Sequence, residues 1–392
     1  MVRSRSARRL FVRVLIVSVL SVLAAAMVVP TLAAEPIKIG FFAPLTGPAA
    51  ADGKSVRQAA ELAVDQLNDA GGINGRPLKL IVYDDRFDPK EAVYIASKLI
   101  EQDRVVAVVS GSYSGPTRAV APIYQRAKIP MISSYGVHPD ITKAGRYIFR
   151  QSFIGTVQGR AGAEAAVGLL GAKKVSILMM DNDFGRELGN AFKARLEKLG
   201  AKAVSTDLFP FGEKDFTPIL TKVKALNPDL IYNTGYIMEG SLIIKQAREL
   251  GIKAAILGTE GIDSFQLPEV AGSAAEDVVI TTNLNRDDPR PVVQNFIKQY
   301  RQRYGMEPDM VGASTYDAIR IVAHAIKLAG TDPTAIRDAI AATKNFDGVT
   351  GIIKGYTSGG EVLKPVQVQV MKNGRFHYFG VIDDLEVVTP PQ

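Results

Sequence analysis

Hydrophobic and polar positions along residues 37–133 predict strands and helices in alternation. Strands are predicted at 37–42, 78–83, 105–110 and 130–133, and helices at 56–67, 88–102 and 116–128. Gly71–Gly72 ends the first helix, and Asn74–Gly75 turns the chain into the next strand. Short connections between alternating strands and helices are typical of a doubly wound parallel sheet.

The apolar run Val105–Ser110 has the composition of a strand that is covered on both faces. Small and hydroxylated residues follow in Gly111–Gly115, and Pro116 suits the first turn of a helix. This turn therefore joins the carboxyl end of a parallel strand to a helix N-terminus. Ligands bind at such edges of α/β sheets, and the N–H groups and helix dipole there favour a carboxylate or a similar anion.

A second series of strands and helices occupies residues 155–258, and the last third of the chain has a different pattern. Helices are predicted at 155–170, 185–199, 216–226 and 237–250, and strands at 175–180, near 204, at 230–233 and at 255–258. Long helical patterns at 291–304, 310–328 and 334–342 then precede a hairpin with an Asn373–Gly374 turn between strands at 366–370 and 376–381. This order indicates that the chain crosses between two lobes more than once.

The first 34 residues have the pattern of a signal peptide. Five arginines and no acidic residue accompany an apolar run from Val14 to Val29, and small residues suit cleavage after Ala33 or Ala34. A retained membrane anchor is the alternative. Without those arginines, 42 of the 47 basic side chains remain against 40 acidic ones, a net charge of +2. No basic cluster is evident, so nucleic acid is not an expected partner.

Few residues in the chain could support catalysis. Cysteine is absent, and the three histidines are far apart, so neither a metal site nor another cofactor is expected. Gly111–Gly115 resembles a nucleophile elbow, but its central residue is Tyr113 and not serine. Acid pairs such as Asp84–Asp85 fall in turns, where solvation explains them better than proton transfer. We therefore expect a binding protein and not an enzyme.

The turns that follow the predicted strands contain groups suited to binding a small ligand. Ser114 can donate its hydroxyl to a carboxylate, and Gly136 allows close approach of backbone. Glu260 can pair with an ammonium group, and Tyr236 can stack on it or hydrogen-bond. A turn serine is often a cap and an isolated glutamate is often solvated. Their shared location at strand ends favours the ligand role.

The chain resembles the leucine/isoleucine/valine-binding protein family of ABC-importer receptors nearly end to end after residue 34. The matching segments are Pro44–Pro48, Asn68–Gly75, Tyr83–Lys90, Gly212–Phe216, Gly235–Tyr236 and Glu260–Gly261. The resemblance implies a type I periplasmic binding protein: two α/β lobes of doubly wound parallel sheet, joined by three crossovers that act as a hinge. It divides the chain into a first lobe at 35–154 and 285–355 and a second lobe at 155–284 and 356–392.

The resemblance also assigns roles to individual residues. Ser114, beside Tyr113, falls where the family binds the ligand carboxylate, and Tyr135–Gly136 where backbone reaches the ligand. Glu260 falls at the acid that holds the α-ammonium, Tyr236 at a tyrosine of the far lobe, and Phe184 at an aromatic that covers the ligand.

Two positions depart from the leucine-type pattern. Val137 replaces a threonine that contacts the ligand head, and Asp52 replaces an aromatic that lines the side-chain pocket. An unpaired carboxylate beside an aliphatic side chain would be costly, so Asp52 either changes the ligand or points to solvent.

These features together predict a monomeric periplasmic receptor that binds an amino acid, branched-chain or related, and passes it to an ABC permease of the inner membrane. An amide, urea or an aromatic carboxylate is the alternative ligand. A periplasmic ligand sensor is the alternative from another class, although no output domain is evident.

Overall fold

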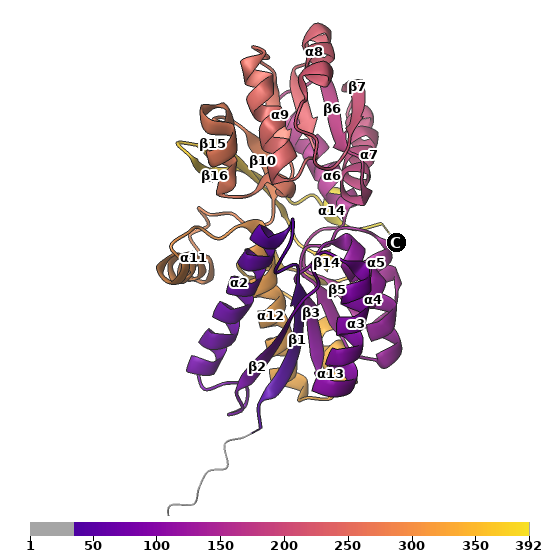
Figure 1. Ribbon diagram of the computed structural model, residues 1–392, viewed down its shortest axis with the longest axis vertical. Coiled ribbons are helices and arrows are strands. Elements are labelled where there is room, and N and C mark those ends of the chain that lie inside the picture. The colour runs from indigo at the N-terminus through magenta and orange to yellow at the C-terminus, as the bar shows by residue number, and fades with distance from the viewer. Residues whose placement is uncertain (1–34, 392) are drawn as a thin grey trace, which may run out of the picture. The chain divides into compact units, whose positions relative to one another are not determined.

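The computed structural model describes residues 35–391. Two separate sheets form the framework, and both belong to one compact unit that begins at Ile37 (Figure 1). The predicted signal peptide at 1–34 lies outside the described residues. Among residues 35–391, none of the helices combines the length and hydrophobicity needed to cross a membrane.

The first lobe is built on a five-stranded parallel sheet in the order β2-β1-β3-β4-β5. Its strands are β1 (Ile37–Ala43), β2 (Leu78–Asp84), β3 (Ala107–Ser110), β4 (Met131–Ser133) and β5 (Ile148–Arg150). Its helices are α2 (Ala50–Asp69), α3 (Pro89–Lys98, continued by a π-helical turn at Leu99–Asp103), α4 (Ser114–Ala127), α5 (Asp140–Lys143), α11 (Pro291–Tyr304), α12 (Met310–Ala329) and α13 (Pro333–Ala341).

Alternate residues of β1 fill two different cores because strand side chains point to opposite faces. Ile39 and Phe41 pack with α2, α11 and α12 on one face, whereas Phe42 packs with α3 and α4 on the other. The sheet is therefore covered on both sides, which explains its near-continuous apolar strands. Two short strand pairs complete this lobe: β11 (Phe346–Gly348) with β12 (Gly351–Ile353), and β13 (Gly355–Tyr356) with β14 (Val362–Leu363).

The second lobe contains a seven-stranded mixed sheet in the order β16-β15-β10-β9-β8-β6-β7. Its strands are β6 (Lys174–Met180), β7 (Lys202–Phe209), β8 (Leu230–Asn233), β9 (Ala255–Gly258), β10 (Val279–Thr282), β15 (Val366–Lys372) and β16 (Arg375–Ile382). Its helices are α6 (Gly155–Glu164, continued by a π-helical turn at Ala165–Leu169), α7 (Asp183–Lys198), α8 (Thr217–Leu226), α9 (Ile237–Glu249), α10 (Gln266–Ala271) and α14 (Leu385–Val388). Strands β6–β10 are parallel, and the hairpin β15–β16 adds to β10 in antiparallel orientation.

The predicted α/β fold with two lobes is confirmed. The chain passes between the sheets three times: between Arg150 and Gly155, after Thr282, and before Val366. The last crossing lies later than the boundary that the sequence suggested at 355. Tyr356 and Val362 pack into the core of the first lobe, so the segment up to about residue 364 stays there.

Candidate ligand-binding site

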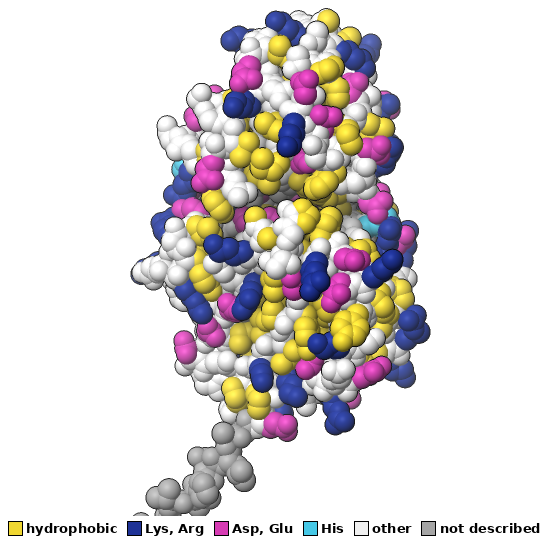
Figure 2. Space-filling model, viewed as in Figure 1, with side chains coloured by type: hydrophobic (Ala, Val, Ile, Leu, Met, Phe, Trp, Pro, Cys, Tyr) yellow, Lys and Arg dark blue, Asp and Glu magenta, His cyan; other side chains and the backbone are white. Residues whose placement is uncertain are grey.

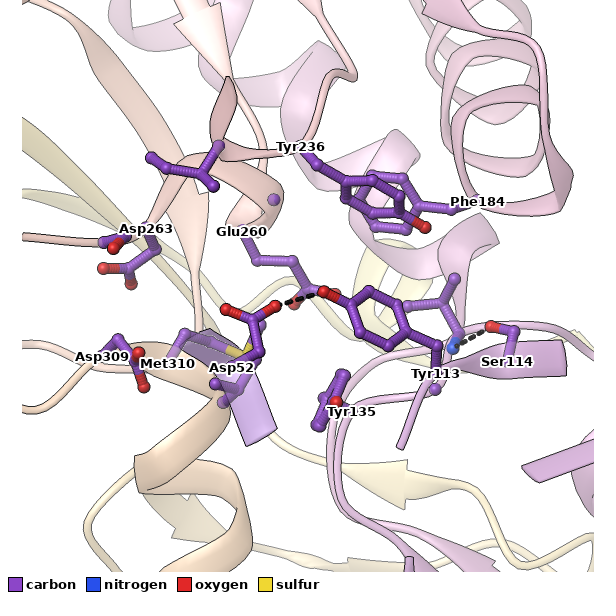
Figure 3. Close-up of a pocket in the computed structure, with 16 residues that line it drawn as sticks. Asp52, Tyr113, Ser114, Tyr135, Phe184, Tyr236, Glu260, Asp263, Asp309 and Met310 are labelled. Atoms are coloured by element: carbon purple, nitrogen blue, oxygen red, sulfur yellow. Dashed lines mark hydrogen bonds between the residues drawn. The ribbon is translucent and has the colours of Figure 1, made fainter. Parts of the chain in front are cut away.

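All nine residues that the sequence pointed to line one pocket between the two sheets (Figure 3). They follow the carboxyl ends of strands from both lobes, where a change in strand order leaves a crevice. The pocket encloses about 600 Å³, counted with the part that opens to solvent. In Figure 2, hydrophobic side chains gather on both sides of the boundary between the lobes on the face shown. Whether the nine residues contact a ligand stays a prediction.

Ser114 is the first residue of α4, two residues before the predicted start at 116, and Pro116 lies in the first turn as expected. Its Oγ accepts hydrogen bonds from the N–H groups of Val137 and His138, at 3.1 and 3.3 Å. A hydroxyl that accepts twice can still donate its proton, and the first turn of a helix leaves N–H groups without intrahelical partners. Ser114 therefore presents hydrogen-bond donors suited to a carboxylate.

A buried arginine holds the loop after β4 in place through hydrogen bonds to its backbone. Arg150 is fully buried and donates hydrogen bonds to the carbonyl oxygens of Gly136 and His138. Its charge is balanced by Glu361, at 2.8 Å. Any Cβ at position 136 would lie only 3.0 Å from the side chains of Ile141 and Ser133, which explains the glycine. The loop thus presents backbone to the pocket in a fixed position.

Aromatic side chains connect the two lobes across the pocket. Tyr113 of the first lobe lies 5.5 Å from Tyr135 and 5.6 Å from Tyr236 of the second lobe, measured between ring centroids. Phe184, at the start of α7, lies 4.9 Å from Tyr236. Val137 packs with Phe184, so its side chain makes an apolar contact with the opposite lobe and offers the ligand no hydroxyl.

Glu260 begins a short helical turn directly after β9 and is only 5 % exposed. Its Oε2 accepts hydrogen bonds from Ser152 Oγ at 3.3 Å and Asn283 Nδ2 at 3.2 Å. Burial raises the pKa of Glu260 to about 8, against the attraction of the buried Lys364. Burial likewise lowers the pKa of Lys364 to about 7. Ser152, Asn283 and Lys364 come from the three crossovers, so Glu260 lies where all three meet.

Asp52 lines the pocket and is only partly exposed, and its carboxylate faces Tyr113, which favours the ligand-facing alternative over the solvent-facing one (Figure 3). Its carboxylate accepts a hydrogen bond from the Tyr113 hydroxyl. Burial raises the pKa of Asp52, and the hydrogen bond from Tyr113 opposes that shift.

Seven further lining residues were not anticipated: Ile237, Gly261, Asp263, Ser264, Asp309, Met310 and Val311. Asp309 caps α12, and its Oδ1 accepts hydrogen bonds from Ser55 Oγ at 2.5 Å and Gly312 N–H at 2.8 Å. Burial, with the charge of Asp52 as a second cause, raises the pKa of Asp309 to about 7. An aspartate before a long apolar helix could have signalled the cap. Nothing in the sequence says that this helix begins at the pocket.

The lining of the pocket consists mainly of hydroxyl, aromatic, acidic and apolar side chains. Within the described part of the chain, no group of three or more histidine and acidic side chains is placed to hold a metal ion. The lining hydroxyls of Ser114, Tyr113 and Tyr236 have no histidine or lysine beside them in the lining of the pocket. The arrangement is suited to recognition of a small polar molecule.

The chain is similar in sequence to known binding proteins. The sequence profile of the family described as periplasmic binding protein matches residues 36–375. A leucine-, isoleucine-, valine-, threonine- and alanine-binding protein of Pseudomonas aeruginosa is 30% identical over 335 residues, which are 85% of this chain and 88% of that protein.

Two solved structures are also similar. A leucine-binding protein from Thermotoga maritima has a TM-score of 0.81 and 32% identity, and the match covers 89% of this chain and 99% of that one. A branched-chain amino acid transporter substrate-binding protein from Streptococcus pneumoniae, in complex with isoleucine, has a TM-score of 0.81 and 30% identity over 88% of this chain and 99% of that one. The chain therefore belongs to the periplasmic binding protein family.

Proposed function

We propose that this protein is the periplasmic receptor of an ABC importer and binds an α-amino acid, branched-chain or related, between its two lobes. One observation carries the proposal. The donors at the start of α4 and the buried carboxyl of Glu260 line the same pocket from opposite lobes. An α-amino acid carries a carboxylate and an ammonium on one carbon, and it can satisfy both sides at once.

The chemistry of binding follows from these two sides. The ligand carboxylate accepts hydrogen bonds from Ser114 and nearby N–H groups, and the ligand ammonium donates to Glu260. The rings of Tyr236 and Phe184 cover the ligand from the second lobe. A ligand that bridges the lobes stabilises their closed arrangement, which is how a hinge protein senses occupancy.

Location and partner are part of the same proposal. The pattern of residues 1–34 supports export with removal of a signal peptide, and family membership supports a periplasmic location. Because the ligand site lies between the lobes, the outer faces of both lobes are left for an inner-membrane permease. A receptor of this kind acts as a monomer that delivers ligand without changing it chemically.

Calorimetry with the purified, ligand-free protein tests the proposal. The panel contains leucine, isoleucine, valine, the polar and charged amino acids, and, as competing classes, benzoate, urea and a small amide. We expect at least one amino acid to bind with a Kd far below about 1 mM and to bind more tightly than any competing compound.

A matched pair of variants sharpens this test. Glu260→Gln removes the group that pairs with the ammonium, and we expect it to weaken amino-acid binding by about ten- to hundredfold, the range for a hydrogen bond to a charged group. Glu249→Gln, on the exposed end of α9, removes the same charge outside the pocket and should leave binding unchanged. The proposal fails if no amino acid binds below about 1 mM, or if both variants bind like the wild type.

A further inference from the structure

The pocket has two unlike halves. At one end lie Ser114 and the aromatic cluster, and at the other lie Asp263 and Asp309, with Glu260 and Asp52 between them and Asp52 on the side of the other aspartates (Figure 3). The acidic residues come from three separate places in the chain: α2, the turn after β9, and the start of α12. The ligand head is assigned to the first half, so the second half faces the ligand side chain.

The four acidic residues differ in whether a cationic side chain lies beside them. Asp263 pairs with Arg286 at 2.5 Å, and Glu260 has Lys364 nearby and is assigned to the α-ammonium. Asp52 and Asp309 have no ion pair with any described residue. No lysine, arginine or histidine is present among the residues that line the pocket.

Each of these two acids also keeps an oxygen atom that can still accept hydrogen bonds. Tyr113 donates to Oδ2 of Asp52, and Ser55 and Gly312 donate to Oδ1 of Asp309. The other oxygen of each carboxyl accepts no hydrogen bond from the described residues. Asp309 is only 7 % exposed, so this unpartnered oxygen belongs to a buried side chain that lines the pocket.

Such an arrangement is poorly suited to an aliphatic ligand. A leucyl side chain would take the remaining water away from two carboxyl groups and give them no partner, which is unfavourable. A cationic group would instead donate hydrogen bonds to both carboxylates and balance their charge. Met310 and Val311 lie beside Asp309 in the pocket lining and offer apolar contact for an alkyl chain that carries the cation.

We propose that the ligand is an α-amino acid whose side chain ends in a cation, an ammonium or a guanidinium, and that Asp52 and Asp309 bind this cation. The inference rests on the proposed function, because the α-amino and α-carboxylate groups place the side chain in the acidic half. The hydrogen bond from Tyr113 makes Asp52 a fixed acceptor, and the capping bonds of Asp309 fix that group in the same way.

Ligand pairs that differ only in charge test the assignment. Lysine is compared with norleucine, and arginine with citrulline, by calorimetry on the ligand-free wild type. We expect at least one cationic member to bind about tenfold or more tightly than its neutral counterpart and more tightly than leucine. If neutral amino acids bind best, the inference is overturned and the proposed function stands. If no amino acid binds, the proposed function itself fails.

Isosteric variants then locate the cation. Asp52→Asn keeps an acceptor for Tyr113, and Asp309→Asn keeps a residue that caps helices well, so both should fold. We expect each to reduce the preference for the cationic ligand about tenfold or more, with little change for the neutral one. Asp69→Asn, at the exposed end of α2, is the matched control and should keep the wild-type preference. The assignment would be contradicted if Asp52→Asn and Asp309→Asn kept the same preference for the cationic over the neutral ligand as the Asp69→Asn control.

Discussion

At the scale of single residues, Glu260 connects the ligand site with the chain crossings. One of its oxygens accepts hydrogen bonds from Ser152 and Asn283, and Lys364 attracts it from the third crossover. A carboxyl in this position favours its neutral form until a cation arrives, because burial penalises the charge. The ligand ammonium therefore changes the electrostatics of the same group that the crossovers hold.

Glu260 should make the stability of the ligand-free protein depend on pH. Its pKa rises from the usual 4.5 to about 8 on folding, so the folded state binds the proton more tightly. The stability that this provides is complete below pH 4.5 and is lost as the pH rises towards 8. We expect the free energy of unfolding of the wild type, relative to Glu260→Gln, to fall between about pH 5 and pH 7.

Urea denaturation at each pH measures this difference. The shared contributions of Asp52 and Asp309 cancel because both proteins contain them. Lys364 acts in the same direction as Glu260: without the attraction of Glu260 its pKa falls further below about 7, so the variant gains stability as the pH rises. A difference that stays constant between about pH 5 and pH 7 would contradict the burial of an ionisable group at this position.

The sequence was informative about residues that directly follow strands. Ser114, Tyr236 and Glu260 could be placed because parallel strands end at one edge of a sheet. Asp309 could not, because it precedes a helix whose N-terminus reaches the pocket only through tertiary packing. The direction of Asp52 also depends on packing, since the hydroxyl that binds it belongs to Tyr113, 61 residues away.

At the scale of elements, the loop after β4 depends on a buried ion pair. Arg150 of β5 donates to two carbonyl oxygens of that loop and pairs with Glu361, which lies between β13 and β14. Arg150 therefore joins the loop, 12 to 14 residues before it, to Glu361, which lies 211 residues after it. An arginine in this environment is costly to leave without its partner.

Breaking this pair on one side should be more harmful than removing both charges. We expect Arg150→Met to lower the free energy of unfolding by about 3–5 kcal/mol, because Glu361 is then buried without a cation. The double variant Arg150→Met with Glu361→Gln should recover part of that loss. Urea denaturation of the two single variants and the double variant gives the coupling energy.

A surface pair is the control for this cycle. Arg57 and Glu61 form an exposed pair one turn apart on α2, at 2.8 Å, and Arg57→Met should cost only about 0.5 kcal/mol or less. Strictly additive effects at Arg150 and Glu361 would show that the pair contributes no coupling.

Most elements could be predicted because their hydrophobic period is clear. Strands β8 and β9 and helix α11 begin and end where the sequence indicated. β5, β10 and the short strands β11–β14 were not predicted. The strands β11–β14 have only two or three residues, too few for an alternation to show, and Gly355 and Gly360, both at positive φ, have the pattern of a loop. This is also why the last crossing was placed too early.

At the scale of the whole molecule, the pocket requires both lobes. Ser114 and Tyr113 belong to the first lobe, and Tyr236 and Glu260 to the second, so no single lobe contains a complete site. A molecule that engages only one lobe gains part of the contacts and none of the stabilisation that comes from bridging.

Thermal denaturation should therefore distinguish a complete amino acid from its parts. The amino acid that binds best in calorimetry is compared with the acid that lacks its amino group and the amine that lacks its carboxylate. At a concentration of about 100 times its Kd, the amino acid should stabilise the protein by about 2.7 kcal/mol and raise Tm. Neither the acid without the amino group nor the amine without the carboxylate should raise Tm at that concentration. An equal rise with either part would show that bridging is not required.

The three crossings also decide when this chain can fold during its synthesis. When residue 284 has been made, the first lobe still lacks α12, which fills much of its core, and β10 still lacks its neighbour β15. Until nearly the entire chain is available, the first lobe cannot cover the face of its sheet against which α12 packs, and the second lobe cannot complete its sheet. Contacts between such distant segments also form slowly. A nascent chain of this protein thus cannot complete either lobe until late in translation, and we expect a fragment that ends before α12 to be cut by proteases more readily than the full chain.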